Sequence, residues 1–159
     1  MKDLYTKITE ILTSDADLRA LVGYRQTKDV PIGLEGLRAG ESEMTIRRGF
    51  QTEGKWKKLV SFYFQADIVM QDFSANIRDL PLVIAIYDRT SDLNLFDISE
   101  RIIFLLDESN LDVSNLTVKN KVHSYGCHYL GQIQSPTYDV DLKSYMMSIR
   151  FSIKARKEL

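Results

Sequence analysis

The stretch LVSFYFQADIVM (residues 59–70) decides the fold because its side chains alternate between apolar and polar. The apolar side chains share one face of an extended chain, and the polar side chains occupy the other. A period of two over this length is typical of a β-strand with one buried face. We therefore predict one long strand here, whose buried face is formed by Val60, Phe62, Phe64, Ala66, Ile68 and Met70.

A shorter alternation precedes this strand and supplies a pairing partner for it. Residues 44–47 read MTIR, and Gly49 ends the segment. The connecting sequence FQTEGKWKK contains Gly54, and a glycine-containing connection between two alternating segments is typical of a hairpin. We expect a β-hairpin with an extended tip that protrudes from the sheet.

Further strands are expected on the C-terminal side. The apolar run LVIAIY at residues 82–87 follows Pro81 and has the length and β-branched content of a buried strand, although periodicity alone leaves a helix open. Later segments alternate again and are separated by a turn-rich connection around Pro136. The predicted later strands are residues 116–122, 125–133 and 144–155, and residues 156–159 are expected to form a frayed tail.

The N-terminal part predicts two helices and a long connection. Asp3 is placed to cap the first helix, and the sequence TSD at residues 13–15 interrupts it. Residues 16–22 form a short second helix that Gly23 ends in the left-handed conformation. Residues 24–40 hold one proline and three glycines without periodicity, which predicts a long loop. The apolar stripe of the first helix consists of Leu4, Ile8, Ile11 and Leu12.

The sequence DLNLFDISERIIFLLDE (residues 92–108) carries several acids beside an apolar run. Asp97 and Glu100 have the spacing of a capping box, in which each carboxylate binds a backbone amide at the start of a helix. This structural role is favoured over a catalytic acid pair. Asp107, at the far end, faces the negative end of the helix dipole and is unfavourable there. We predict a packing helix with Arg101 outside and a buried stripe of Ile98, Ile102, Leu105 and Leu106.

The order of these elements predicts an α+β fold. Runs of strands with few helices favour a mostly antiparallel sheet with helices on one face. We expect a single domain over residues 1–159, with two main helices packed on one face of the sheet and the protruding β-hairpin. A chain of 159 residues is long enough to bury a substantial core without disulfides.

The overall composition narrows the function classes. The formal net charge is −1, from 21 Lys and Arg against 22 Asp and Glu, which gives no general attraction to nucleic acid. The single cysteine has no partner for an internal disulfide, which fits a reducing compartment. No window approaches the roughly 18 to 20 apolar residues of a membrane span, so no membrane association is expected.

The cluster of His123, Cys127 and His128 is the best candidate for metal binding or nucleophilic catalysis. In an extended strand, however, residues 123 and 127 share one face while residue 128 points to the other. A structural zinc site also needs four ligands, and these are the only histidines in the chain. The sequence contains no nucleotide-binding, serine-hydrolase or zinc-protease motif. We expect no metal, no cofactor and no enzyme activity.

The tip of the predicted hairpin is unusually rich in cations and contains the only tryptophan, which we expect to be exposed there. Tryptophan and arginine are enriched at protein interfaces, whereas lysine and arginine alone also attract nucleic acid. Contact with a protein or another subunit is favoured because no aromatic base-stacking pattern accompanies the cations. The candidate interface residues are Arg47, Arg48, Lys55, Trp56, Lys57 and Lys58.

Several stretches together resemble the tail-terminator (tail-completion) proteins of long-tailed bacteriophages and prophages. They are the opening MKDLYTKITEILTSDADLRALVG, the strand VSFYFQADIVM, the helix DISERIIFLLD and the closing alternation KSYMMSIRFSIKAR, which in this order span most of the chain. The resemblance implies a non-enzymatic virion assembly protein that caps the tail tube as a ring, commonly a hexamer, and joins the tail to the head.

The same resemblance implies the partners and the location. The partners are other copies of the chain, the tail tube protein and head–tail connector proteins, with passive contact to DNA in the lumen. The protein is expected in the host bacterial cytoplasm during assembly and then in the tail or neck of the virion. The alternative is a nucleic-acid-binding accessory protein that uses the basic hairpin at residues 47–58.

Overall fold

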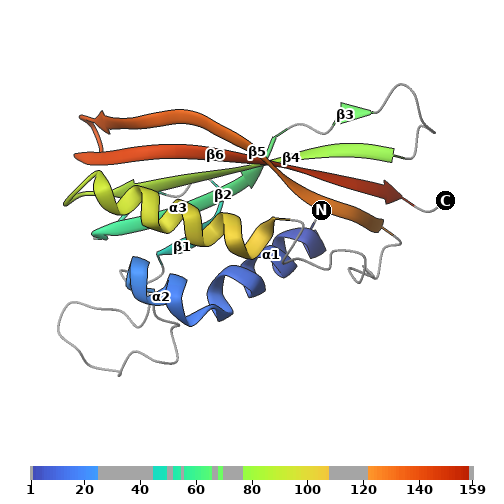
Figure 1. The fold of residues 1–159 in the computed structure, drawn as a ribbon, viewed down its shortest axis with the longest axis horizontal. Helices are drawn as coiled ribbons and strands as arrows, with labels where there is room; N and C mark the ends of the chain where they lie inside the picture. The colour runs from blue at the N-terminus through green and yellow to red at the C-terminus, as the bar shows by residue number, and fades with distance from the viewer. Residues whose placement is uncertain are drawn as a thin grey trace.

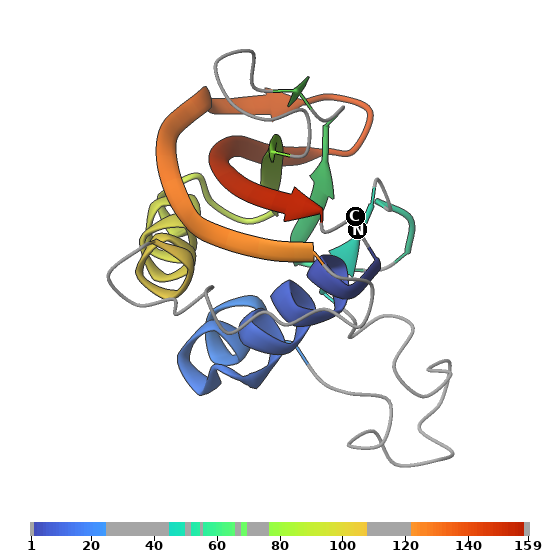
Figure 2. The same cartoon turned by 90° about the vertical axis from the view of Figure 1, so that its right-hand side faces the viewer.

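The predicted α+β fold, a mostly antiparallel sheet with helices on one face, is confirmed by a computed structural model (Figures 1 and 2). The structure describes residues 2–24, 45–49, 52–54, 56–65, 68–69, 77–107 and 122–157. Within these ranges the helices are α1 (Lys2–Ser14), α2 (Ala16–Val22) and α3 (Leu93–Leu106). The strands are β1 (Ile46–Arg48), β2 (Lys58–Phe64), β3 (Ile68–Val69), β4 (Ile77–Asp88), β5 (Val122–Asp139) and β6 (Ser144–Lys157).

Strand β4 lies in the middle of the sheet. The strand order is β1-β2-β4-β6-β5, and β3 pairs with β4 beyond the end of β2. Ile84 of β4 is opposite Phe62 of β2 on one side and Ile149 of β6 on the other. Every residue at positions 81–88 is buried. The strand interpretation of residues 82–87 is therefore confirmed, and the strand extends further at its N-terminal end than predicted.

Both faces of β4 are covered, but by different partners. Leu82, Ile84 and Ile86 belong to the main core, which the three helices and the inward faces of β2, β5 and β6 complete. Ala85 and Tyr87 point the other way and pack in a smaller cluster. Burial on both faces explains why the run LVIAIY is continuously apolar instead of alternating.

The single long strand predicted for residues 59–70 is wrong in one respect, because β2 ends at Phe64 and pairing resumes in β3. Phe64 is opposite Leu82 and Ile68 is opposite Asp79, so the pairing shifts by one residue between these two points. Pro81 accepts a hydrogen bond from the Gln65 amide but has no N–H to return. Because one backbone hydrogen bond of the pairing with β4 is missing at Pro81, this point can accommodate one extra residue on the side of β2 and β3.

The predicted β-hairpin at residues 44–59 is also wrong, since β1 runs parallel to β2. Ile46 is opposite Val60 and Arg48 is opposite Phe62. The Val60 amide donates to the Thr45 carbonyl, and the Gly49 amide donates to the Phe62 carbonyl. Alternation determines which face each side chain occupies but leaves strand direction open, so it did not distinguish the two pairings.

The C-terminal half forms a longer ribbon than expected. Strands β5 and β6 pair antiparallel from Val122 opposite Lys157 to Asp139 opposite Ser144, with several register shifts in β5. Pro136 therefore lies within a strand instead of a turn, and residues 156–157 are paired instead of frayed. Irregular pairing of this kind tolerates a proline on an edge strand. The predicted strand at residues 116–122 falls outside the described ranges except for Val122.

The N-terminal helices follow the prediction with two adjustments. Asp3 lies inside α1 instead of capping it. Thr13 and Ser14 belong to the helix, where their hydroxyls donate to carbonyls of the preceding turn. Asp15 alone separates α1 from α2, and its carboxylate caps the Leu18 amide at 2.8 Å. Gly23 ends α2 with φ +66°, as predicted. Apart from Tyr24, the predicted loop at residues 24–40 lies outside the described ranges.

Helix α3 starts at Leu93, so the predicted capping box of Asp97 and Glu100 is wrong. The buried Asp88 carboxylate organises the preceding turn instead, accepting hydrogen bonds from the Thr90 and Ser91 amides and the Asn94 side chain. The turn held by Asp88 ends just before Leu93, so the helix starts about one turn earlier than the predicted start at Asp97.

Three positions within one turn of α3 test its orientation. Ile102 is fully buried, Leu105 is half-buried and Phe104 is exposed. We expect Ile102→Ala to lower the free energy of unfolding by about 2 to 5 kcal/mol, and Leu105→Ala by less. Phe104→Ala, the control on the same helix, removes only an exposed ring that stacks on Arg101 and should change it by less than about 1 kcal/mol. Urea unfolding followed by circular dichroism measures all three, and equal costs for Ile102 and Phe104 would contradict the orientation.

Candidate interaction surface

Trp56 is buried, which contradicts the exposed position that the sequence predicted for it. Its side chain is 3% exposed and packs with Leu59, Ala85 and Tyr87 on the sheet face opposite the helices. The indole N–H donates to the Thr52 carbonyl at 2.8 Å. Trp56 therefore covers β4 from the second side and presents no ring for a partner or a base to stack on.

Arg89 fixes the segment around Trp56 to the end of the sheet. Its guanidinium carbon lies 3.8 Å from the centre of the indole ring. The same group donates to the Trp56 carbonyl at 2.9 Å and to the Leu142 carbonyl at 3.2 Å. One cation thus joins the segment before β2, the end of β4 and the turn between β5 and β6, with stacking and charged hydrogen bonds together.

The remaining basic candidates lie in different environments. Arg47 is half-buried and donates to the Glu53 carbonyl, and burial lowers its pKa. Arg48 and Lys57 are exposed, and Lys58 is half-buried. Lys55 lies outside the described ranges. A role of these residues in subunit or partner contact stays a prediction.

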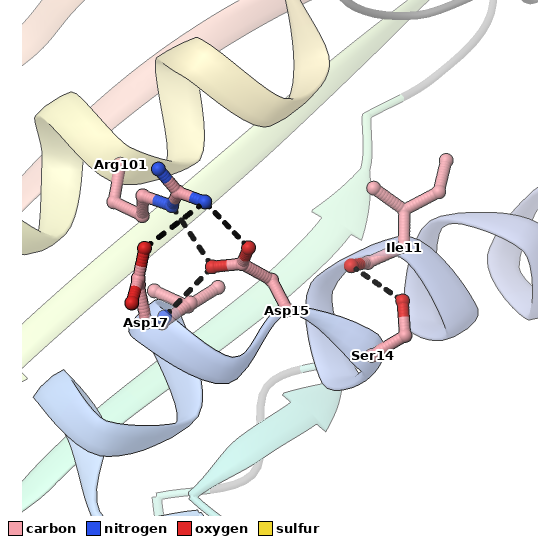
Figure 3. A network of polar contacts seen from close by, with 6 residues as sticks. Ile11, Ser14, Asp15, Asp17 and Arg101 are labelled. Atoms are coloured by element: carbon pink, nitrogen blue, oxygen red, sulfur yellow. Dashed lines mark hydrogen bonds and ion pairs between the residues drawn. The ribbon is translucent and has the colours of Figure 1, made fainter.

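Helix α3 is fixed to the start of α2 by one arginine and two carboxylates. Figure 3 shows Arg101 reaching from α3 to Asp15, the residue between α1 and α2, and to Asp17. The Arg101 guanidinium donates from Nε to one Asp15 oxygen at 2.9 Å and from Nη2 to the other at 2.6 Å. The Asp17 carboxylate lies 3.4 Å from the same Nη2. This two-point contact sets the rotation of α3 about its axis.

The Asp15 carboxyl has a lowered pKa. The hydrogen bond from Arg101 is the largest cause, and it outweighs burial, which acts in the opposite direction. The pKa of the Asp88 carboxyl is also lowered. Burial, the largest single effect, raises this pKa, but the hydrogen bonds from Thr90, Asn94 and Ser91 together outweigh it. Both carboxylates are therefore structural.

The outward side of α3 carries large apolar residues. Leu93 is 71% exposed, Phe96 is 45% exposed and Phe104 is 53% exposed. At about 100° per residue these three fall within an arc of roughly 80°, with Asp97 and Glu100 beside them. We call Leu93, Phe96, Asp97, Glu100 and Phe104 the α3 face. The residues that pack into the core, Leu95, Ile98, Ile102 and Leu106, lie on the opposite side.

Strand β5 forms a long edge of the sheet next to α3. In the strand order it pairs only with β6. The Tyr129 amide of β5 donates to the Asp107 carboxylate at the end of α3, at 3.2 Å, so this acid has a structural partner despite its unfavourable place on the helix dipole. Within the described part of the chain, all exposed large apolar residues lie on α3, on β5 or in the turn after β5. Those beyond α3 are Leu130, Ile133, Tyr138 and Val140.

The sequence contained a signal for the α3 face that its interpretation missed. Leu93, Phe96 and Phe104 recur at helical spacing, at i, i+3 and i+11, parallel to the stripe that was identified. Starting the predicted helix at Asp97 placed Leu93 and Phe96 before the helix and concealed this second stripe.

The histidine–cysteine cluster does not form a reactive centre in the described structure. Cys127 is fully buried in the main core, and burial, helped by the charge of Asp107, raises the pKa of its thiol to about 12. His128 is half-buried, and the His123 side chain is outside the described set. Among the side chains that are described, no three His, Cys, Asp or Glu residues are grouped to hold a metal ion. None of the described helices is long and apolar enough to cross a membrane.

Comparison with known proteins identifies a shared fold. No protein-family model matches the chain, and no curated protein matches it. A chain in the solved structure of the virion of a native gene transfer agent particle superimposes with a TM-score of 0.60 and 12% sequence identity. The match covers 94% of this chain and 91% of that chain. At this identity the two chains share a fold along nearly their whole lengths.

The packing of Trp56 under Arg89 predicts a simple optical result. Because Trp56 is the only tryptophan, its emission should be blue-shifted and poorly quenched by acrylamide in the native protein. Arg89→Met should move the emission to longer wavelength and lower the free energy of unfolding by about 1 to 3 kcal/mol. Arg150→Met, which removes an exposed arginine from β6, serves as the control and should leave both unchanged.

The Asp15–Arg101 contact predicts a pH-dependent stability. The folded-state pKa of Asp15 lies below the reference value of 3.8, so its stabilising effect is complete above about pH 4 and disappears as the pH falls through the folded-state pKa. Asp15→Asn keeps a good helix cap but loses the charge. We expect the variant to melt below the wild type at pH 7 and the difference to shrink below pH 4. A difference independent of pH would contradict the assigned role.

Proposed function

We propose that this chain is a structural protein of a phage-like particle that caps the tail tube as a ring and joins the tail to the head. The observation that carries the proposal is the fold shared with a chain of a gene transfer agent virion, over 94% of this chain. The resemblance of the element order to tail-terminator proteins supports the finer role. The partners are further copies of the chain, the tail tube protein and the head–tail connector.

The distribution of exposed apolar side chains also supports an assembly role. Monomeric proteins keep contiguous apolar patches small, and larger ones usually mark binding sites. Here the exposed aromatic and aliphatic side chains of the described ranges gather on α3 and around β5. A buried Cys127 with a raised thiol pKa favours a non-catalytic protein over a cysteine nucleophile. The protein would assemble in the host cytoplasm and remain in the tail or neck of the virion.

The alternative of a nucleic-acid-binding protein is weakened, because Trp56 is buried under Arg89 and cannot stack on a base. The exposed cations Arg48 and Lys57 remain available for phosphate contact. In a ring around a DNA channel such contact would be passive and salt-dependent.

Deletion of the gene in the phage or prophage that encodes the chain tests the proposal. We expect tails of uncontrolled length that do not join heads, and heads that remain filled. Adding back the purified protein should stop tube growth and place a ring of its mass at the tube end in electron micrographs. Tails of normal length that join heads would overturn the proposal, and salt-dependent DNA binding with no binding to tubes would favour the alternative.

A further inference from the structure

The two acids of the α3 face have no compensating charge of their own. Asp97 and Glu100 are exposed, and neither side chain has a hydrogen bond or ion pair with another described residue. The nearby cation Arg101 forms its ion pairs with Asp15 and Asp17, and its guanidinium carbon also lies 4.8 Å from the centre of the Phe104 ring. The α3 face is therefore an apolar stripe with a local negative charge.

Two exposed cations belong to the part of the sheet formed by β1 and β2. Arg48 ends β1, and Lys57 directly precedes β2. Within the described ranges neither has a hydrogen-bonded or ionic partner through its side chain. Figure 2 shows α3 on one side of the molecule, while β1 and the segment that follows it lie on the opposite side. In the strand order, β1 and β5 are the two opposite edges of the sheet.

We propose that the α3 face binds a second copy of this chain, with Arg48 and Lys57 of the neighbouring copy opposite Asp97 and Glu100. This inference rests on the proposed function and names the subunit contact of the ring. Leu93, Phe96 and Phe104 supply the buried apolar area. The charges select the partner and its orientation, as charged groups commonly do at the margin of an interface.

The position of the two surfaces determines the type of assembly. The negative α3 face does not complement itself, because two copies facing each other would oppose acid to acid. The contact must therefore join two different surfaces of successive copies. A heterologous contact repeated from copy to copy closes into a ring when its rotation permits, and the α3 face of each copy is then covered.

Charge reversal tests the proposed pairing. Wild-type protein is expected to run as a multiple of 18.3 kDa in light scattering at a concentration where rings form. Asp97→Lys/Glu100→Lys should raise the dissociation constant of assembly at least about tenfold and shift the mass toward the monomer. Arg48→Glu/Lys57→Glu should do the same. Mixing the two variants, or combining all four changes in one chain, should restore assembly.

A control with the same change in charge is available elsewhere on the molecule. Glu10→Lys/Asp141→Lys also exchanges two exposed acids for lysines, but on α1 and in the turn after β5. It should assemble like the wild type. Phe104→Ser should weaken assembly with only a small change in melting temperature, because its side chain is exposed in the single copy and stacks only on Arg101 among the described ring contacts. Circular dichroism on each variant separates a failure to assemble from a failure to fold.

The outcomes separate the inference from the proposed function. If wild-type rings form and control tail length, but the α3 and β1 reversals leave assembly unchanged, the inference is wrong and the function stands. If both reversals weaken assembly but no variant restores it, the two surfaces do not meet and the inference is also wrong. Wild-type protein that stays monomeric both in solution and on tail tubes overturns both.

Discussion

The burial of β4 on both faces is the constraint on which the rest of the structure depends. Its residues 81–88 are all buried, so two different layers must cover it. The helices form one layer, and Trp56 with Leu59 forms the other. Because Trp56 precedes β2, the segment before β2 must lie over the second face of the sheet. This course of the chain is compatible with the parallel pairing of β1 and β2. Arg89 then fixes that segment through the indole ring and two carbonyls.

Periodicity in the sequence predicted most of the elements but few of the contacts between them. The strand over residues 82–87, the Gly23 helix end and the buried side of α3 followed from local patterns. The direction of β1 did not, because alternation is the same in parallel and antiparallel strands. Asp88 lies before α3 and its turn displaced the expected capping box, while the Arg101–Asp15 contact joins residues 86 positions apart. Long-range polar contacts of this kind leave no period in a sequence.

The candidate interaction surface differs from the one predicted from the sequence for the same physical reasons. The basic segment at residues 47–58 was expected to expose an aromatic anchor, but β4 needed that ring for its own burial. The earlier start of α3 exposed Leu93 and Phe96 on the helix and left Asp97 and Glu100 without a capping role. A helix that is apolar on two sides is suited to two partners, and the core supplies only one. A subunit ring in a phage-like particle would supply the other.

Cross-linking between copies tests the central claim most directly. A chain carrying Lys57→Cys/Glu100→Cys would be treated with a short bis-maleimide, while the buried Cys127, with its raised thiol pKa, stays unreactive in the folded protein. The heterologous contact predicts a ladder of covalent oligomers on a denaturing gel, extending beyond the dimer to the full ring. Cross-linking that stops at the dimer, or that does not occur in assembled rings, would contradict it.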